Sequence, residues 1–567
     1  MKKTIILLSF LCICLSLYAQ RLEKPLTAWQ YCQETELDKQ PEKGWQESIL
    51  PQPAEGNIAF WYRTTIKPPF KQHVELSFDG NMPQAQVFIN GKEVYRHGNN
   101  LNTFAVDITQ WLVKGGNEIA VRQPSAPLQQ PYVAQPGARL IQSADTHIPL
   151  HGVQINTTEI TEKRAIVNIH TEVVASEAQK LRLNIEIYLG KQLVGSTSKT
   201  FATAKGNAVD QPVSISWPHP WSPESPIRYT AVINLYEGKV LLDSYTQPFG
   251  IRNATIEGDS LLLNGIKQDC RGVTLEPDYS ILAANRCYSD ILHHLELLKD
   301  MGANMLLPHP ALLSKELITI ADSIGMMVLL QPATMDVLPY QNNASIILGE
   351  NVTLPKTQND LHSIVPFADV IGADGKEKDL FYLYRSHWNK RSHTLHICSD
   401  WNKQEDEQLS VSIYTDYPEA ELFVNGSSQG RRSYPHTWQQ VAFEEGELSV
   451  AAFNSKGMAV LSDRINTAGE PFFIELVQRK TGKLSYVTIR ICDFDGNLCP
   501  MADNLLHIAV SGTGRLLGIE DTEKASFVTE QNIDQPAYKG TLTIIVSGSI
   551  DITVSADNIK GENISIK

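Results

Sequence analysis

Three Asn-Gly pairs, each beside short runs of alternating apolar and polar residues, constrain the fold of this chain more than any other feature. Asn and Gly tolerate the positive φ angles of the two-residue turn whose twist matches a pair of antiparallel strands. Each pair therefore predicts a β-hairpin. The three pairs are Asn90-Gly91, Asn264-Gly265 and Asn425-Gly426.

Runs with a period of two residues continue along most of the chain and are separated by turn residues. Short strands at such regular spacing favour β-sandwiches. A chain of 567 residues is also too long for a single core, and such lengths correspond to roughly three to five domains. The further strands expected are Val167 to Val174, Leu181 to Tyr188, Tyr229 to Leu235, Val411 to Tyr414 and Thr541 to Val546.

One region breaks this pattern, because strand-like and helix-like segments alternate in it. Such alternation predicts the start of a parallel βαβ arrangement. Pro332 to Lys378, in contrast, contains prolines and Asn-rich turns, which predict loops rather than regular strands. The strands are expected at Gln268 to Val273, Asn304 to Leu307 and Met327 to Leu330. The helices are expected at Tyr288 to Met301, ended by Gly302, at Ser314 to Ile324, with Ser314 as N-cap, and near Asp379 to Trp388.

The first residues have the three parts of a secretory signal peptide. Lys2 and Lys3 form a basic start, Thr4 to Leu17 is an apolar run, and Ala19 precedes Gln20 at the expected cleavage point. A buried N-terminal strand, the alternative interpretation, would not need the two lysines. We therefore expect an exported protein, periplasmic or extracellular, and no later stretch is apolar for long enough to cross a membrane.

Charge and cysteine content exclude several other classes of function. The net charge of −14 with no block of like charge disfavours nucleic acid as a partner. The cysteines after the signal show no Cys-x-x-Cys spacing, so we expect no zinc site and no cofactor. Cys492 and Cys499 could pair across a hairpin, but burial of each as a small apolar residue is slightly favoured. The six cysteines are Cys32, Cys270, Cys287, Cys398, Cys492 and Cys499.

Several sequence phrases occur in an order that is specific when they are taken together. They are Ala59 to Arg63, Leu76 to Gly80, Ala85 to Gly91, Phe104 to Thr109, Gly115 to Asn117, Trp221 to Pro226, Phe249 to Arg252, Leu263 to Gly265, Arg271 to Val273, Asp379 to Trp388, Trp401-Asn402, Leu422 to Gly426 and Thr467 to Pro471. Over nearly the whole mature chain, this order resembles glycoside hydrolase family 2, which includes β-galactosidases, β-glucuronidases and β-mannosidases.

The resemblance implies a multidomain, mainly β protein with a shortened catalytic barrel. The phrases up to Asn117 are similar to the family's jelly-roll sugar-binding domain, and Asp379 to Trp388 is similar to its last barrel helix. The expected domains are a signal peptide at 1–19, a jelly roll at 20–159, an immunoglobulin-like domain at 160–253, an incomplete TIM-barrel-like (β/α) domain at 254–388, and two C-terminal immunoglobulin-like sandwiches at 389–470 and 471–567.

The resemblance also implies a chemistry that this chain does not support. Family members hydrolyse with retention, using two glutamates on a complete (β/α)₈ barrel, of which the acid stands in an Asn-Glu pair. Such a barrel needs roughly 250 residues, but the stretch from Asn264 to Trp388 has 125. The only Asn-Glu pair is Asn117-Glu118, in the expected jelly roll. We therefore expect that both catalytic glutamates have been lost.

The remaining early barrel positions depart from the family pattern as well. Glu276-Pro277-Asp278 stands where a His-x-Asp cluster is usual, Leu306 to Pro310 has an aliphatic residue at the Arg position, and Gln331 replaces an acidic residue. Glu276, Asp278 and His309 would lie at the C-terminal ends of strands, where barrel chemistry is found. They are weak candidates for substrate binding, and inherited loop residues are the preferred interpretation.

The function predicted from the sequence is therefore that of an inactive family member that binds carbohydrate or serves as a scaffold. One alternative is an active β-galactosidase-type hydrolase with replacement catalytic residues or a partner subunit that completes the barrel. A second alternative is a non-functional gene remnant. The open barrel edge also suggests that a second copy or another protein covers it.

Overall fold

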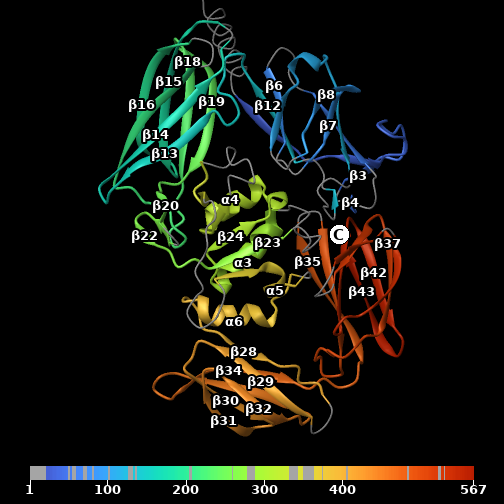
Figure 1. Cartoon of the computed structure of the whole chain (residues 1–567). Helices are drawn as coiled ribbons and strands as arrows, with labels where there is room; N and C mark the ends of the chain where they lie inside the picture. Colours follow the sequence, from blue (N-terminus) through green and yellow to red (C-terminus); the bar gives the residue numbers. More distant parts are fainter. Residues whose placement is uncertain are drawn as a thin grey trace, which may run out of the picture. The chain divides into compact units, whose positions relative to one another are not determined.

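The computed structural model divides into two compact units, residues 1–270 with 304–355 and residues 271–303 with 356–567 (Figure 1). It describes residues 21–48, 52–53, 59–67, 73–78, 82–99, 103–124, 132–133, 137–175, 177–203, 207–257, 260–276, 288–330, 342–348, 363–372, 375–403, 407–481, 484–520, 525–528 and 530–567. The expected signal peptide, Asp278, Cys287 and Gln331 lie outside these ranges. No helix in them is long and apolar enough to span a membrane.

The first unit begins with a sandwich of two antiparallel sheets. Trp29, Tyr62 and Phe78 are fully buried in its core. Asn90 and Gly91 have φ angles of 51° and 79° between β7 and β8, so the first predicted hairpin is confirmed. One sheet is β1 (Leu22–Leu26), β12 (Ala138–Ser143), β6 (His73–Phe78) and β9 (Phe104–Asp107). The other is β3 (Gln46–Glu47), β2 (Gln30–Gln33), β5 (Ala59–Ile66), β10 (Asn117–Pro124), β7 (Gln86–Ile89) and β8 (Lys92–Arg96), with a separate pair β11 (Tyr132–Val133) and β4 (Gln52–Pro53).

A second sandwich follows in the same unit, and its strands alternate between buried and partly exposed side chains. This alternation places one face of each sheet in a shared apolar core, and the strands predicted in this part of the chain are confirmed. The sheets are β13 (Val153–Ile160), β14 (Arg164–Val173) and β17 (Asn207–Ser216), and β16 (Gln192–Ala202), β15 (Lys180–Leu189), β18 (Tyr229–Glu237) and β19 (Val240–Phe249).

The first unit also holds part of the α/β region. The parallel strands β24 (Met305–Pro308), β25 (Met327–Leu330) and β26 (Ile346–Leu348) pair in that order. Helix α4 (Lys315–Ile324) begins at Ser314, whose hydroxyl accepts a hydrogen bond from the Leu317 N–H, as the sequence predicted. A small antiparallel sheet precedes these strands, with a turn at Asn264-Gly265. Its strands are β20 (Ala254–Glu257), β21 (Ser260–Leu263) and β22 (Ile266–Lys267).

Side chains from outside the parallel strands complete the core of this part. Trp221, in the loop before β18, is fully buried, and its indole N–H donates to the Asp322 carbonyl at 2.9 Å. The second sandwich and α4 are therefore joined by packing and by a buried hydrogen bond. The shared core consists of Trp221, Leu261, Leu263, Cys270, Met305, Met327, Leu329, Ala344 and Ile347.

The second unit contains the other pieces of the α/β region. Strand β23 (Gly272–Leu275) pairs in parallel with β27 (Ile364–Pro366), the last strand of the region. Helix α3 (Tyr288–Met301) ends at Gly302, whose φ is 98°. A side chain on Gly302 would lie 2.5 Å from the backbone of Trp388, in helix α6 (Asp379–Trp388). Glycine is therefore required where α3 meets α6.

Two expectations for this region were wrong. The strand expected at Gln268 to Val273 is β23 and begins four residues later. The stretch expected to form loops contains β26, β27 and the short helix α5 (Phe367–Val370). Both strands have three residues, and such apolar triplets are too short to show a period of two.

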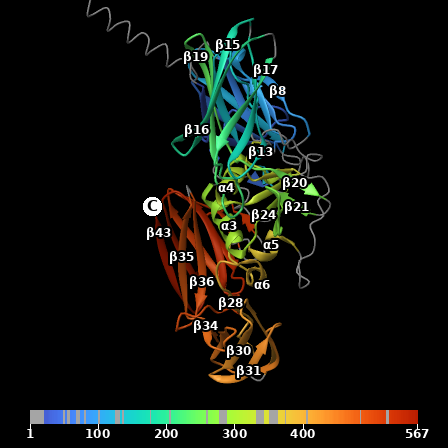
Figure 2. The ribbon, with the colours of Figure 1, turned by 90° about the vertical axis from the view of Figure 1, so that its left-hand side faces the viewer.

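The rest of the second unit is two more sandwiches, and Figure 2 shows β35 and β36 side by side in the last one. The predicted fold class is confirmed. The first consists of β28 (Leu395–Cys398), β29 (Gln408–Thr415) and β32 (Thr437–Ala442), and of β31 (Ser427–Ser433), β30 (Glu419–Val424), β33 (Glu447–Phe453) and β34 (Ala459–Asn466). In the last, nine strands are hydrogen-bonded in the order β39 (Ala525–Phe527), β38 (Arg515–Glu520), β41 (Thr541–Ser547), β36 (Leu484–Cys492), β35 (Phe473–Thr481), β43 (Ile559–Ile566), β42 (Ile550–Ala556), β37 (Leu505–Gly512) and β40 (Asn532–Pro536), and β35 and β43 join its two faces by a parallel pairing at Phe473 and Lys560.

Cys492 and Cys499 lie in this last sandwich. Both are buried and neither forms a disulfide. The structure agrees with the preferred interpretation, in which each is a small apolar core residue.

The α/β region is expected to be the least protected part of the molecule in hydrogen exchange. Its outer strands β26 and β27 have three residues each, so few backbone hydrogen bonds hold them, and exchange should be faster there than in the sandwich strands. Mass spectrometry of the intact protein would measure this difference. If hydrogen exchange in residues 327–378 were as slow as in the sandwich strands, the shortened α/β region would instead be a compact and stable domain.

Candidate functional site

Two of the three site residues proposed from the sequence lie in the described part of the chain. Glu276 follows β23 and is exposed, and His309 follows β24 and is half-buried. They belong to different units, and Asp278 lies outside the described residues. Among the described residues, no group of three or more His, Cys, Asp or Glu side chains is arranged to hold a metal ion.

The Asn117-Glu118 pair has a structural role. The Asn117 side chain is buried, accepts hydrogen bonds from the Val113 N–H and the Asn90 amide, and donates to the Val113 carbonyl. Glu118 accepts a hydrogen bond from the Gln40 amide at 3.0 Å. The pair therefore closes a turn before β10 and holds the Asn90 hairpin. The prediction that it belongs to the sandwich is confirmed.

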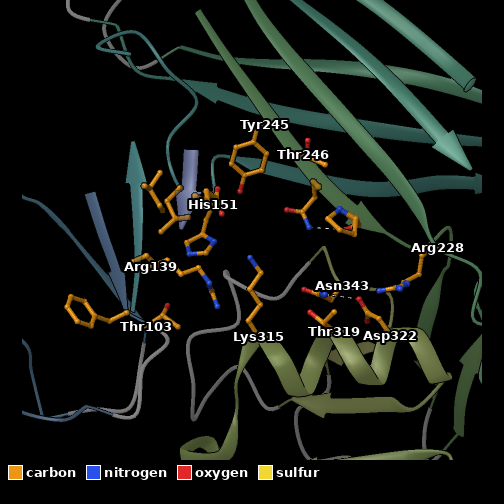
Figure 3. A pocket seen from close by; sticks show the side chains of 17 residues that line it. Thr103, Arg139, His151, Arg228, Tyr245, Thr246, Lys315, Thr319, Asp322 and Asn343 are labelled. Atoms are coloured by element: carbon orange, nitrogen blue, oxygen red, sulfur yellow. Dashed lines mark hydrogen bonds between the residues drawn. The ribbon is translucent and has the colours of Figure 1, made fainter. Parts of the chain in front are cut away.

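A cavity of about 130 Å³ in the first unit gathers charged side chains from distant segments. We call it the basic pocket and define it by Arg139, Arg228, Lys315 and His151. Figure 3 shows Arg139, His151 and Lys315 directed toward the same space. Glu23 and Asp322 are the carboxylates of its lining.

Regular elements fix the positions of these side chains. Arg139 is on β12, which pairs with β6 on one side and β1 on the other. Lys315 occupies the first turn of α4, immediately after the Ser314 cap. Tyr245, a further lining residue, is on β19 and is almost completely buried. The pocket is thus built on two sandwiches and one helix, which hold its side chains more rigidly than loops would.

Asp322 holds α4 to the turn before β26. Its carboxylate accepts hydrogen bonds from the Ser345 N–H at 2.7 Å, from the Ser345 hydroxyl at 2.6 Å and from the Asn343 amide at 2.7 Å. Burial lowers the pKa of the nearby Arg252 guanidinium to about 10, and the charge of Asp322 opposes this shift. Asp322 is therefore a structural anchor in the pocket wall.

Glu23 is held as a carboxylate. Burial raises the pKa of its carboxyl group, but the hydrogen bond from Arg21 and the charges of Arg21, Lys315 and Arg139 outweigh burial, so the pKa lies below its usual range. The Arg21 Nε donates to Glu23 at 2.9 Å. A general acid for glycoside hydrolysis needs a raised pKa, so Glu23 has the opposite property.

The basic pocket was not found by sequence reasoning. Its four basic residues come from four segments between positions 139 and 315, and no motif joins them. The Ser314 cap placed Lys315 at the start of a helix, but nothing in the sequence indicated that Arg139 lies nearby.

Four family models match the chain. They are a glycosyl hydrolase 2 galactose-binding domain-like family at residues 38–155, glycosyl hydrolases family 2 at 146–252, a domain family of unknown function at 406–461, and glycoside hydrolase family 2 C-terminal domain 5 at 475–565.

Curated relatives match the chain at low sequence identity. A β-galactosidase of Bacteroides ovatus is 21% identical over 745 residues, covering 88% of this chain and 86% of the relative. A β-galactosidase of Thermoanaerobacter pseudethanolicus is 24% identical over 234 residues, covering 38% of this chain and 31% of the relative.

Solved structures share the fold. A glycosyl hydrolase family 2 member from Bacteroides cellulosilyticus has a TM-score of 0.80 at 18% identity, covering 96% of this chain and 100% of that chain. A β-glycosidase from Bacteroides vulgatus gives the same four values.

Proposed function

Because the chain belongs to glycoside hydrolase family 2, we propose that it is an exported member that binds carbohydrate and has lost the family's hydrolytic reaction. The single observation that supports this proposal is the composition of the α/β region. Five parallel strands, β23 to β27, occupy its described part, whereas the reaction uses two glutamates on a complete barrel of eight.

Three of the glutamates in the described part of this region do not directly follow a parallel strand. Glu296 points to solvent from α3, Glu316 is in the first turn of α4, and Glu377 is exposed before α6. Glu276 is the one that directly follows a described parallel strand. A retaining hydrolase needs two carboxyl groups about 5–5.5 Å apart, and this set offers one candidate for the pair.

The alignment with the Bacteroides ovatus β-galactosidase supports the shortening. It extends over 745 residues, although this chain has 567. The relative therefore contains long stretches with no counterpart here.

The proposal predicts that the purified mature chain does not hydrolyse nitrophenyl β-galactoside, β-glucuronide or β-mannoside above the buffer rate. An active family member, assayed in parallel, serves as the positive control. Release of nitrophenol that disappears in Glu276→Gln or Asp278→Asn would identify a replacement active site and exclude the proposal. The proposed carbohydrate binding is tested separately. The protein is immobilised on a sensor surface and titrated with β-linked oligosaccharides, and saturable binding is expected.

An active retaining hydrolase is the second candidate. It is favoured by the β-galactosidase of Bacteroides ovatus, whose similarity covers 88% of this chain. A partner subunit would then have to supply the second carboxylate. Assays on the protein purified from its native membrane-free extract, with any partner still bound, would show turnover that the isolated chain lacks.

A further inference from the structure

We propose that the basic pocket binds the anionic group of an acidic sugar, a carboxylate or a sulfate, between Arg139 and Lys315. This assignment rests on the proposed function for the sugar part of the ligand. The anion site itself follows from the side chains of the pocket.

The first argument is the convergence of cations. Arg139 and Lys315 come from β12 and α4, and Figure 3 shows both side chains directed into the cavity, with His151 beside them. Arg228 also lines the pocket, but Figure 3 shows it directed toward Asp322 rather than toward Arg139 and Lys315. Arginine and lysine are the side chains that recognise carboxylate and sulfate oxygens, with arginine offering a planar pair of donors.

The second argument is that the carboxylates of the lining have their own partners. Arg21, which is outside the pocket lining, donates to Glu23 at 2.9 Å. Asp322 accepts three hydrogen bonds from Ser345 and Asn343. Arg139 also lies 3.9 Å from Glu316, whose side chain is 39% exposed, and an exposed ion pair of this kind is weak. The lining thus carries three permanent cations and two carboxylates, each of which accepts hydrogen bonds from groups other than these cations.

The third argument is the contrast with the whole chain, whose net charge is −14. The negative charge of the whole chain repels a small acidic ligand on average. The basic pocket differs from the rest of the surface, because its cations outnumber its carboxylates. Walls of low dielectric concentrate the field of the cations inside it.

Size and neutral groups indicate a ligand larger than a bare ion. The cavity of about 130 Å³ exceeds the roughly 10–15 Å³ that one water needs. Thr103, Thr246, Gln247 and Thr319 also line it, and their hydroxyl and amide groups can donate to and accept from sugar hydroxyls. A monosaccharide unit with one acidic substituent fits this combination.

The test is calorimetric titration of the full mature chain with glucuronic acid, a sulfated monosaccharide, glucose and inorganic sulfate. We expect both acidic sugars or one of them to bind, glucose to bind at least tenfold more weakly, and inorganic sulfate to compete. Whichever acidic sugar binds more tightly shows whether the pocket prefers a sugar carboxylate or a sugar sulfate.

Matched variants locate the binding. Arg139→Gln with Lys315→Gln should weaken acidic-sugar binding at least tenfold, whereas Lys191→Gln with Lys267→Gln, exposed positions outside the pocket, removes the same charge and should leave it unchanged. Lys315→Gln alone, a change at an exposed residue, repeats the test if the double variant fails to fold. Equal binding by pocket and control variants, or no binding of any acidic probe, would overturn the assignment.

These outcomes separate this inference from the proposed function. Binding of neutral oligosaccharides without acidic sugars leaves the proposed function standing and rejects the anion site. Acidic-sugar binding through Arg139 and Lys315, together with turnover of nitrophenyl glycosides, supports the anion site and rejects the loss of catalysis.

Discussion

Replacement of Trp221 by alanine is expected to lower the free energy of unfolding by about 3–5 kcal/mol, the range for a large aromatic removed from a core. The Trp221 side chain is fully buried among residues of the small sheet β20–β22 and of strands β24, β25 and β26. Its loss would leave a cavity and also remove the hydrogen bond to the Asp322 carbonyl at 2.9 Å.

The effect should extend beyond a simple cavity. Gly325, at the end of α4, is packed so closely against Pro223 that a side chain there would lie 2.4 Å from the Pro223 carbonyl oxygen. The segment around Trp221 and α4 are therefore in close contact. In the variant, the backbone of β24 and β25 should exchange with solvent faster, in addition to the loss of packing around the loop that holds Trp221.

Chemical denaturation, followed by hydrogen exchange of 305–330, measures both consequences. Trp217→Ala is the matched control, because Trp217 is four residues away and 63% exposed, and its loss should change stability by less than about 0.5 kcal/mol. Equal effects of the two variants would show that Trp221 does not hold the α/β region.

Replacement of Arg479 by methionine is expected to destabilise the second unit by about 3 kcal/mol. Arg479 is on β35, and its guanidinium lies 3.2 Å from the carboxylate of Asp290, which is 1% exposed at the start of α3. The Tyr486 hydroxyl on β36 lies 3.5 Å from the same carboxylate. Methionine keeps the length of the side chain but leaves the buried Asp290 without the guanidinium charge.

Two further variants show whether the buried charge causes the effect. Arg464→Met removes an exposed arginine that lies 3.4 Å from Glu447, and exposed pairs of this kind contribute about 0–1 kcal/mol. Asp290→Asn combined with Arg479→Met should recover much of the loss, because no unpaired charge is then buried. Thermal unfolding of the three variants gives the comparison. A double variant no more stable than Arg479→Met would point to packing instead.

The sequence predicted those parts of the fold that local signals determine. Helix α4 was located by its apolar period and by the Ser314 cap, α3 by its period and Gly302, and the hairpins by Asn-Gly turns. Strands β26 and β27 were missed, because a triplet such as Ile364 to Pro366 becomes a strand only when a parallel partner pairs with it.

The candidate site could be predicted in part. The family followed from the order of the sequence phrases, and the unsuitability of Asn117-Glu118 for catalysis followed from the position of the pair in a strand lead-in. The basic pocket did not follow, because Arg139 and Lys315 are 176 positions apart and their proximity depends on how complete domains pack. The pair of Asp290 and Arg479 was missed for the same reason, since the two residues are separated by 189 positions.

Because α3 and α6 are in contact, the number of strand–helix repeats between them can change without disturbing either helix. The Asn389 amide donates to the Asp300 carbonyl at 2.6 Å, Arg385 pairs with the Asp300 carboxylate at 2.8 Å, and β23 pairs with β27. A closed barrel likewise pairs its first strand with its last. In the second unit the chain therefore enters and leaves the α/β region at adjoining places, so repeats can be excised during evolution without moving the point at which the following sandwich begins.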